Sequence, residues 1–461
     1  MKEYDIIVIG AGGGTKLVTP PSQIGKKVAV FEKESPGGTC LNRGCIPSKM
    51  LIYPSEILRF PQESEKFPIR FPSLPEADFS TIVKRVSDTV DADSASIPVA
   101  YDKNPNIDYY PYFARFLSDK VIEANGETFT AKHIFITVGT RPLVPEIPGL
   151  KETPFWTSRE ALRPDSLPQS MIVLGAGFIS LELGAAYAAY GCKVTGFARK
   201  DVMKDLDGEV KEELKSNLPF PIHTHSAIQN VTFDGKNFSV TAKDKEGNSF
   251  VTTAEKLLVA TGIIPNTDDL GLENTKVKIN EKGFIEVNDF LETSVSGVFA
   301  FGDVIGRHFF RHSANFEGEY LFQNLFLSET SSPIHYPPMP SAVFTHPQIA
   351  SVGSTEEELI RKQIHYYKGV NRYSSSAMGM ARMSTTGFVK VLIDKQKETI
   401  LGAHIIGDEA SNMIHHLVLG MNLNANLDQL LNMIYIHPAL PEITRNALRK
   451  VKEERKKEKG F

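Results

Sequence analysis

The sequence predicts an α/β protein: two Rossmann-like, three-layer nucleotide-binding domains, followed by a smaller α+β domain. Three observations carry this prediction. Fully apolar segments at residues 4–10 and 171–175 run directly into glycine-rich turns, the order of elements then repeats, and the pattern changes after residue 340. A buried strand that enters a glycine turn is typical of a parallel sheet that binds a nucleotide at its carboxyl edge.

In the first half, residues 26–32 form a second buried strand that ends in an acid, and residues 49–59 are helical. Prolines at 61, 68, 72 and 75 predict a surface insertion over residues 61–75 without a regular helix. A helical pattern returns near residues 81–100. Short strands then lead to a buried strand at residues 133–139.

In the second half, the strand at residues 171–175 precedes an apolar helix through Tyr190 and a strand at residues 193–199. The strand at residues 256–262 repeats the one at 133–139. From about Pro340 the pattern is alternating strands and two helices, and residues 449–459 form a mixed-charge helix or a frayed, solvated tail. We expect domains at 1–150, 151–270 and 341–461, with residues 271–340 returning to the first.

Composition excludes several kinds of partner. The chain has 461 residues and a net charge of −4, from 51 basic and 55 acidic residues, which gives no electrostatic case for nucleic acid or an anionic membrane. No apolar run approaches the roughly 20 residues that span a bilayer, and none is typical of a signal peptide. We therefore expect a cytoplasmic protein. We do not expect its three cysteines to form structural disulfides.

The first glycine turn has the chemistry of a dinucleotide site. Its glycines allow close approach of a pyrophosphate to the backbone at a helix N-terminus, and Glu32 can accept hydrogen bonds from a ribose diol. Two features depart from the pattern: Thr15 replaces a third glycine, and the prolines at 20 and 21 must break or shorten the helix. The glycines are Gly10, Gly12 and Gly14.

The second glycine turn contains Gly175 and Gly177, with Ser180 at the third position. Where an acid would bind a ribose 2′-hydroxyl, the chain has Ala198 and then two cations, Arg199 and Lys200. Because this position lacks a carboxylate and is followed by two cations, it favours a 2′-phosphate, and hence NADPH over NADH. The alternative is that these are solvated loop charges, and Lys204 is a weaker third candidate.

The segment GGTCLNRGCIPSK, at residues 37–49, contains two cysteines with four residues between them. At the start of a predicted helix, Cys40 and Cys45 can close a small disulfide loop, and the helix N-terminus favours a thiolate. A zinc site would need two further sulfur or nitrogen ligands, and the sequence has no second cysteine pair. We therefore expect a redox-active pair and no metal.

With this motif the chain resembles the flavin-dependent pyridine nucleotide–disulfide oxidoreductases. It looks most like dihydrolipoamide dehydrogenase, with glutathione, mycothione and mercuric reductases as relatives. The resemblance covers nearly the whole chain, although the paired C-terminal cysteines of mercuric reductase are missing. Other segments that carry it lie at residues 137–142, which include Gly139, at 260–266, which include Gly262, and at 298–303, 343–347 and 437–442.

The resemblance implies FAD at the first glycine turn, with Gly139 and Gly262 in cofactor-binding segments. Thr39 would lie near the pyrophosphate and Asp303 near the ribitol. Lys49 would approach the flavin and pair with Glu182. Phe178 matches the aromatic side chain that covers the flavin until nicotinamide displaces it, and His312 lies in a segment that runs past the ring.

The same resemblance implies a role for each sulfur. Cys40 matches the thiol that exchanges with a dithiol or disulfide substrate, and Cys45 the sulfur beside the flavin. His437 would be the acid–base group, oriented by Glu442, and would reach the site from the partner subunit of a homodimer. Imidazole suits this role because its pKa lies near neutral pH. Association with a 2-oxoacid dehydrogenase complex is a further implication.

Several alternatives remain open. The cysteine motif and the HPALPE segment favour dihydrolipoamide dehydrogenase, whereas the cations after the second strand favour an NADPH-dependent reductase of small disulfides, similar to glutathione reductase. A flavoprotein oxidase or transhydrogenase without disulfide exchange, or a non-catalytic binding protein, is less consistent with the cysteine pair. Ile263 replaces an arginine that is usual in the family, and Cys192 is expected to be a buried apolar thiol.

Overall fold

The first glycine turn ends the central strand of a seven-stranded sheet in the computed structural model, which describes residues 1–460. The central strand β1 pairs in parallel with β2 and β6, and β16 also pairs in parallel with β6. Residues near 300 therefore return to the first sheet. The strands are β1 (Lys2–Ile9), β2 (Val28–Phe31), β3 (Ile107–Tyr110), β4 (Arg115–Ser118), β5 (Val121–Ala124), β6 (Glu127–Ile136) and β16 (Val298–Ala300).

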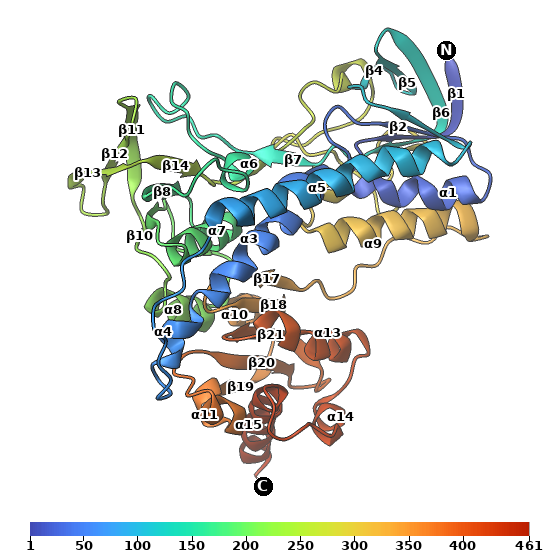
Figure 1. The fold of residues 1–461 in the computed structure, drawn as a ribbon. Helices are drawn as coiled ribbons and strands as arrows, with labels where there is room; N and C mark the ends of the chain where they lie inside the picture. The colour runs from blue at the N-terminus through green and yellow to red at the C-terminus, as the bar shows by residue number, and fades with distance from the viewer. Residues whose placement is uncertain (461) are drawn as a thin grey trace.

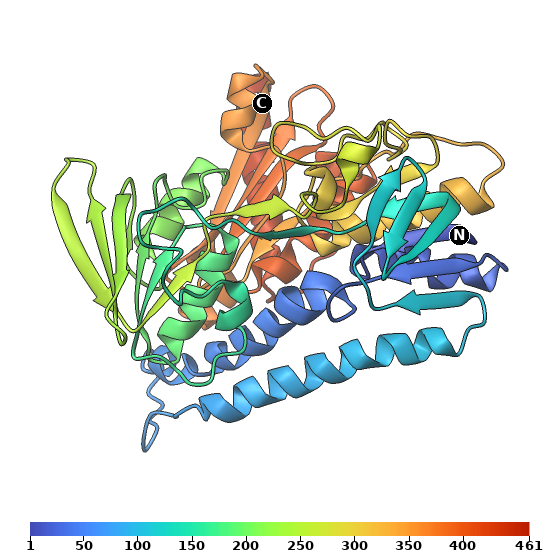
Figure 2. The same cartoon turned by 90° about the horizontal axis from the view of Figure 1, so that it is seen from above.

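Helices of the first unit pack beside this sheet, and the 24-residue α5 runs along one side of the molecule (Figure 2). The prediction of no helix in the proline-rich insertion was wrong for residues 61–64, because the first turn of a helix tolerates proline and α4 begins just before Pro61. No helix within residues 1–460 is long and apolar enough to cross a membrane. The helices are η1 (Gly13–Leu17), α1 (Thr19–Gln23), α2 (Gly38–Arg43), α3 (Cys45–Ile57), α4 (Phe60–Ser64), α5 (Phe79–Asp102), η3 (Gly302–Ile305), α9 (Arg311–Phe322) and the π-helical η4 (Gln323–Leu327).

The second unit is a four-stranded parallel sheet in the order β10-β9-β8-β14, flanked by a three-stranded antiparallel sheet, β11 to β13. A two-stranded pair, β7 with β15, lies between the two nucleotide-binding units in the chain. The strands are β7 (Thr140–Pro142), β8 (Ser170–Leu174), β9 (Lys193–Phe197), β10 (Ile222–His223), β11 (Ala227–Phe233), β12 (Phe238–Lys243), β13 (Ser249–Ala254), β14 (Lys256–Val259) and β15 (Ile263–Pro265). The helices are α6 (Ser158–Ala161), α7 (Phe178–Ala189) and α8 (Gly208–Ser216), whereas η2 (Leu272–Asn274) is hydrogen-bonded to β4 of the first unit.

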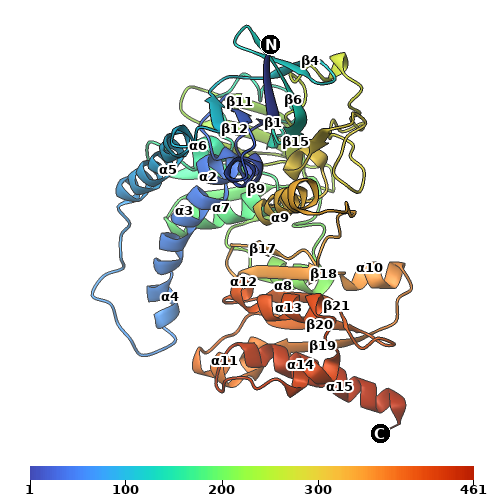
Figure 3. The ribbon, with the colours of Figure 1, turned by 90° about the vertical axis from the view of Figure 1, so that its right-hand side faces the viewer.

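The third unit is a five-stranded antiparallel sheet in the order β17-β18-β21-β20-β19, which forms the lower part of the molecule in Figures 1 and 3. The prediction of two helices here was too low, because most of these helices are too short to show a full apolar period. The elements are β17 (Ser341–Val343), β18 (Ile349–Gly353), β19 (Tyr366–Arg372), β20 (Phe388–Asp394), β21 (Ile400–Ile406), α10 (Glu356–Arg361), η5 (Tyr373–Ser375), α11 (Ala377–Ala381), α12 (Ala410–Met413), α13 (His415–Asn422), α14 (Leu427–Asn432) and α15 (Pro441–Lys459).

The C-terminal charged segment is helical and held in place. Arg455 pairs with Glu398 at 2.5 Å, and Lys395 pairs with Glu458 at 2.7 Å. These pairs tie α15 to the turn between β20 and β21, so the helical alternative for residues 449–459 is the one observed.

A buried ion cluster joins the second unit to the third. Lys390 of β20 is fully buried, and its Nζ lies 2.9 Å from Asp207, 2.7 Å from Glu209 and 2.5 Å from Glu356. Asp207 and Glu209 belong to the start of α8, and Glu356 begins α10. Burial alone would lower the pKa of Lys390, but the three carboxylates raise it above its ordinary value. Lys390 is therefore a charged side chain inside the contact.

Candidate active site

The cysteine motif folds as two consecutive helices that meet at Gly44. Cys40 lies in α2, and Cys45 is the first residue of α3, as the sequence predicted for a helix N-terminus. Gly37 and Gly38 have positive φ angles of 104° and 66°, which glycine adopts without strain. The residues between the cysteines are therefore mostly helical, which brings the two sulfurs to the same junction.

Both cysteines are free, and their sulfurs share a hydrogen bond. That bond and the charge of Lys49 lower the pKa of Cys45 to about 7, against the opposing effect of burial. The same bond, burial and the neighbouring sulfur raise the pKa of Cys40 above its ordinary value, although the charge of Arg311 opposes this. In the reduced pair the proton therefore stays on Cys40, and the thiolate forms at Cys45.

Lys49 connects the cysteine helix to the second nucleotide-binding unit. Its Nζ lies 2.6 Å from Oε2 of Glu182 on α7 and 4.4 Å from the ring centroid of Phe344. The backbone amide of Phe344 donates to the other oxygen of Glu182 at 3.1 Å. The structure thus places the two predicted partners in contact. It adds Phe344 of the third unit, which lies in the 343–347 segment that carries the resemblance but was not among the predicted site residues.

Phe178 opens α7 and is about one-third exposed. Its ring packs edge-on against Phe310, with 6.0 Å between centroids, and Phe310 stacks in turn on His312 at 4.9 Å. The His312 ring forms a hydrogen bond with the carbonyl of Pro340 at 3.0 Å. This row of rings gives Phe178 a support on one side and leaves part of it accessible.

The first glycine turn has the shape that a pyrophosphate requires. A Cβ on Gly38 would lie 2.6 Å from the Cα of Gly12, so these two backbones approach without room for side chains. The helix that follows is split into η1 and α1, as the two prolines predicted. Gly14 provides the close packing expected of a third glycine, since a Cβ there would overlap Val8 and Thr137. The cradle therefore fits the diphosphate of FAD despite Thr15.

Two carboxylates of the first unit were also predicted to bind the cofactor. Glu32 accepts hydrogen bonds from the amides of Ala11 and Glu34, each at 2.9 Å, and burial raises its pKa. Asp303 accepts a hydrogen bond from the Thr140 hydroxyl at 3.0 Å, and burial raises its pKa too. Each still has acceptor capacity, because a carboxylate offers about four lone-pair sites. This suits the hydroxyl groups of a ribose and a ribitol.

The second glycine turn leads into α7. Gly175 has a φ of 119° beneath the Ala260 carbonyl, whereas a Cβ on Gly177 would meet open space. Ser180 is fully buried and its hydroxyl donates to the Ala260 carbonyl at 3.3 Å, so it replaces a third glycine without disturbing the packing. The second glycine turn therefore keeps its close backbone packing.

Arg199 and Lys200 lie just beyond the carboxyl end of β9, and both are exposed. Within residues 1–460 neither forms an ion pair with a carboxylate. Lys204 is close to Asp205, at 3.8 Å. Arg199 and Lys200 are therefore available to a ligand, whereas Lys204 already interacts with Asp205.

His437 lies in the third unit, just before α15. Its Nδ1 is 3.0 Å from both oxygens of Glu442, and its side chain is largely exposed. Within the described chain His437 has no hydrogen bond to Cys40. Glu442 also pairs with Arg445, which sequence reasoning missed although the i,i+3 spacing on one helix was a usable signal.

The remaining predicted residues are also placed. Thr39 is exposed on α2, Gly139 and Gly262 have positive φ angles at the ends of β6 and β14, and Cys192 is buried. Ile263 pairs with Pro142 across β15 and β7. On this strand pair a guanidinium comes from Arg141, which donates to the Pro265 carbonyl at 2.8 Å.

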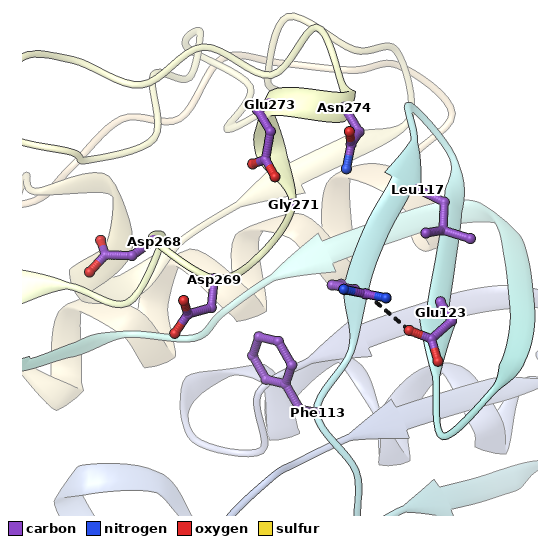
Figure 4. Close-up of a pocket in the computed structure, with 9 residues that line it drawn as sticks. Phe113, Leu117, Glu123, Asp268, Asp269, Gly271, Glu273 and Asn274 are labelled. Carbon is purple, nitrogen blue, oxygen red and sulfur yellow. Dashed lines mark hydrogen bonds and ion pairs between the residues drawn. The ribbon is translucent and has the colours of Figure 1, made fainter.

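A cavity of about 650 Å³ lies between the β4–β5 hairpin and the turn that contains η2, and none of the predicted site residues lines it (Figure 4). Its polar groups are mostly carboxylates, and its one guanidinium, Arg115, is paired with Glu123 at 3.0 Å. It holds neither a cysteine nor a histidine. Its chemistry does not match the redox pair, so size alone is a poor guide to the site here. The lining residues are Phe113, Arg115, Leu117, Glu123, Asp268, Asp269, Gly271, Glu273 and Asn274.

The fold and the cysteine pair define a class of protein: an oxidoreductase with two nucleotide-binding domains that transfers electrons to or from a redox-active cysteine pair. The sequence pattern of the pyridine nucleotide-disulphide oxidoreductases matches residues 4–318, and that of their dimerisation domain matches residues 339–448. The chain belongs to this family. It is an FAD-dependent enzyme with a CxxxxC redox pair, NAD(P) binding is typical of its family, and the dimerisation domain supports a homodimer.

Curated relatives match nearly the whole chain but carry different names. The chain is 32% identical to mycothione reductase of Mycobacterium tuberculosis, over 97% of the chain and 99% of the relative. It is 31% identical to dihydrolipoyl dehydrogenase 1, mitochondrial, of Arabidopsis thaliana, over 96% and 90%. It is equally similar, at 31%, to mercuric reductase of Staphylococcus aureus, over 93% and 79%.

The fold also matches a solved structure. The HOCl-induced flavoprotein disulfide reductase RclA from Escherichia coli superimposes with a TM-score of 0.86, over 97% of this chain and 99% of the other. The sequence identity is 24%, so this likeness concerns the architecture.

Proposed function

We propose that this enzyme is an NADPH-dependent reductase of a small-molecule disulfide. The observation that carries the proposal is the pair of exposed cations, Arg199 and Lys200, at the end of β9. At the corresponding place in the first unit the chain has a carboxylate, Glu32. Cations there suit the 2′-phosphate that distinguishes NADPH from NADH.

FAD is held, in this proposal, by the cradle of Gly10, Gly12 and Gly14, with Glu32 on the adenosine ribose and Asp303 toward the ribitol. Thr39 and Gly139 lie along the pyrophosphate side. When bound, FAD relays an electron pair between the nicotinamide and the cysteine sulfurs. On the nicotinamide side, Gly175, Gly177 and Gly262 surround the second nucleotide, and Phe178 covers the entry.

The sulfur chemistry follows from the two thiols. Cys40 attacks one sulfur of the substrate disulfide, so that a Cys40–substrate disulfide forms and the other substrate sulfur leaves as a thiolate. The Cys45 thiolate then attacks Cys40, which releases the second substrate thiolate and closes the Cys40–Cys45 disulfide. Two electrons have moved from the protein dithiol to the substrate. A pKa of about 7 at Cys45 keeps its thiolate available at neutral pH.

Protons for these steps come from His437. Its imidazole takes the Cys40 proton and gives it to the leaving substrate thiolate, while Glu442 fixes the ring through Nδ1 and leaves Nε2 free. Because His437 has no contact with Cys40 in its own chain, it serves Cys40 of the partner subunit in the homodimer. The Lys49–Glu182 ion pair lies, in this proposal, between Cys45 beside the flavin and the unit that binds the nicotinamide.

The test is a comparison of nucleotides and substrates on the purified, flavin-loaded enzyme. NADPH oxidation with glutathione disulfide, mycothiol disulfide and lipoamide is measured beside NADH oxidation with the same substrates. We expect at least one disulfide to give a kcat/KM with NADPH well above that with NADH. Equal use of NADH, or no disulfide reduction by a yellow enzyme, would overturn the proposal.

A second candidate function is dihydrolipoyl dehydrogenase, which the cysteine motif and the HPALPE segment favour and whose curated members match at 31% identity. In that direction a dithiol reduces the protein disulfide and NAD+ accepts the hydride. Rapid NAD+ reduction by free dihydrolipoamide would favour this candidate, and association with a 2-oxoacid dehydrogenase complex would then be tested by co-sedimentation.

A further inference from the structure

The carboxylate of Glu442 is bound from two sides. On one side His437 lies 3.0 Å from both of its oxygens, and on the other a guanidinium nitrogen of Arg445 lies 2.5 Å from Oε1. The amide of Ala439 adds a third hydrogen bond, at 3.2 Å to Oε2. The Glu442 side chain is only 4% exposed. This carboxylate therefore divides its charge between an imidazole and a fixed cation.

Arg445 is itself held in position. Its side chain is 21% exposed, and its guanidinium carbon lies 5.7 Å above the ring of Tyr435. Its Nε is buried and has no hydrogen-bond partner, and Glu442 is its one carboxylate partner within residues 1–460. The guanidinium is thus directed at Glu442 by the helix on one side and by an aromatic ring on the other.

We propose that Arg445 is a positioning residue for the acid–base group: it fixes Glu442 and offsets its negative charge, so that His437 releases its proton more readily. This inference rests on the acid–base role proposed for His437. A carboxylate that faced His437 alone would hold the imidazolium form more strongly. With Arg445 present, Glu442 still orients the His437 ring. It raises the basicity of His437 by less than an unpaired carboxylate would.

The other titratable groups near His437 and Glu442 do not supply a positive charge like that of Arg445. Tyr435, on the segment before His437, has its pKa raised by burial, so it is neutral at neutral pH. His416 of α13 meets the Tyr435 ring edge-on, at 6.4 Å between centroids, and burial lowers its pKa. On α15 the charged groups in contact are Glu442 and Arg445 themselves. The field at His437 within this chain is therefore set by that pair.

The experiment is the pH dependence of kcat/KM for the disulfide substrate in Arg445→Met holoenzyme. Loss of the cation should move the limb that reports His437 upward by about 0.5 to 1 pH unit. Arg445→Lys should move it back toward the wild-type position. Arg449→Met, one turn later and exposed, is the matched control and should leave the profile unchanged. Flavin content, thermal midpoint and dimer size confirm that each variant is folded.

His437→Gln separates the two ways in which the proposal can fail. If it reduces disulfide turnover by about 100-fold or more while Arg445→Met leaves the profile in place, the role of Arg445 is wrong and that of His437 stands. If His437→Gln retains wild-type turnover, the acid–base assignment and the inference about Arg445 both fall. A shift in Arg445→Met that Arg445→Lys does not reverse would also overturn it.

Discussion

The two nucleotide-binding units use one scaffold with opposite charges at one position. In both, a buried strand ends at a glycine with positive φ, and that glycine lies beneath a backbone carbonyl, of Thr137 in the first unit and of Ala260 in the second. After the next strand the first unit presents Glu32 and the second presents Arg199. The two units thus share the same backbone turn and differ in the charge of the side chain that follows the next strand.

The two units also differ in how those side chains are held. Glu32 is partly buried and fixed by two backbone amides, whereas Arg199 and Lys200 are exposed and unpaired within the described residues. A cofactor that stays bound benefits from a preorganised partner, and a nucleotide that must leave in every cycle does not need one. The difference is consistent with a resident flavin and an exchanging nicotinamide.

The largest expected effects come from breaking each glycine turn separately. Gly10→Ala would bring Cβ within 2.6 Å of the Thr137 oxygen at a φ of 103°, and Gly175→Ala repeats this against Ala260. Such strain costs about 1–3 kcal/mol. We expect Gly10→Ala to purify with little flavin, whereas Gly175→Ala keeps its flavin and shows a KM for NADPH raised roughly 10- to 100-fold. Absorbance at 450 nm and steady-state kinetics measure the two effects.

The matched pair also tests whether the two turns are independent. Loss of flavin in Gly175→Ala would show that they are not, and a fully yellow Gly10→Ala would remove the first turn from the FAD site.

A smaller effect is expected from removing the cations. In Arg199→Met with Lys200→Met, two exposed ion pairs with a 2′-phosphate would be lost, each worth up to about 1 kcal/mol. We expect kcat/KM for NADPH to fall about 10-fold while that for NADH changes little. Lys193→Met, at the opposite end of β9, is the control. An equal fall for both nucleotides would mean that these residues do not read the phosphate.

The smallest effect concerns Lys49, where the two units meet. Lys49→Met removes a charge that stabilises the Cys45 thiolate and frees Glu182, which opposes it, so the pKa of Cys45 should rise from about 7. A rise of about one unit is expected. The pH dependence of iodoacetamide labelling in the reduced protein measures it, with Lys84→Met on the exposed face of α5 as control. An unchanged labelling curve would contradict the electrostatic role of Lys49.

Local signals explain what could be predicted from the sequence. The strands that enter Gly10 and Gly175 are continuous apolar runs followed by glycine, so their place in buried parallel sheets followed from the residues alone. The split of the first helix followed from two prolines. A helix was also predicted over residues 49–59, and α3 begins four residues earlier, at Cys45, and ends at Ile57.

Contacts between distant segments could not be predicted in this way. Phe344 reaches Glu182 through its backbone amide, which carries no sequence signature, and Thr140 reaches Asp303 from 163 residues away. The short helices of the third unit have too few turns for an apolar period. Lys390 is the clearest case, because a lysine in a strand is ordinarily exposed, and its three carboxylates come from two other helices.

That buried lysine restricts how the enzyme can move. A rotation of the second unit away from the third would separate Lys390 from Asp207 and Glu209 and leave a buried charge short of partners, which costs about 3–5 kcal/mol. Hinge opening at this contact is therefore disfavoured. In the proposed function, access for nicotinamide would then come from rearrangement of single side chains, such as the partly exposed ring of Phe178, and not from rotation of the second unit.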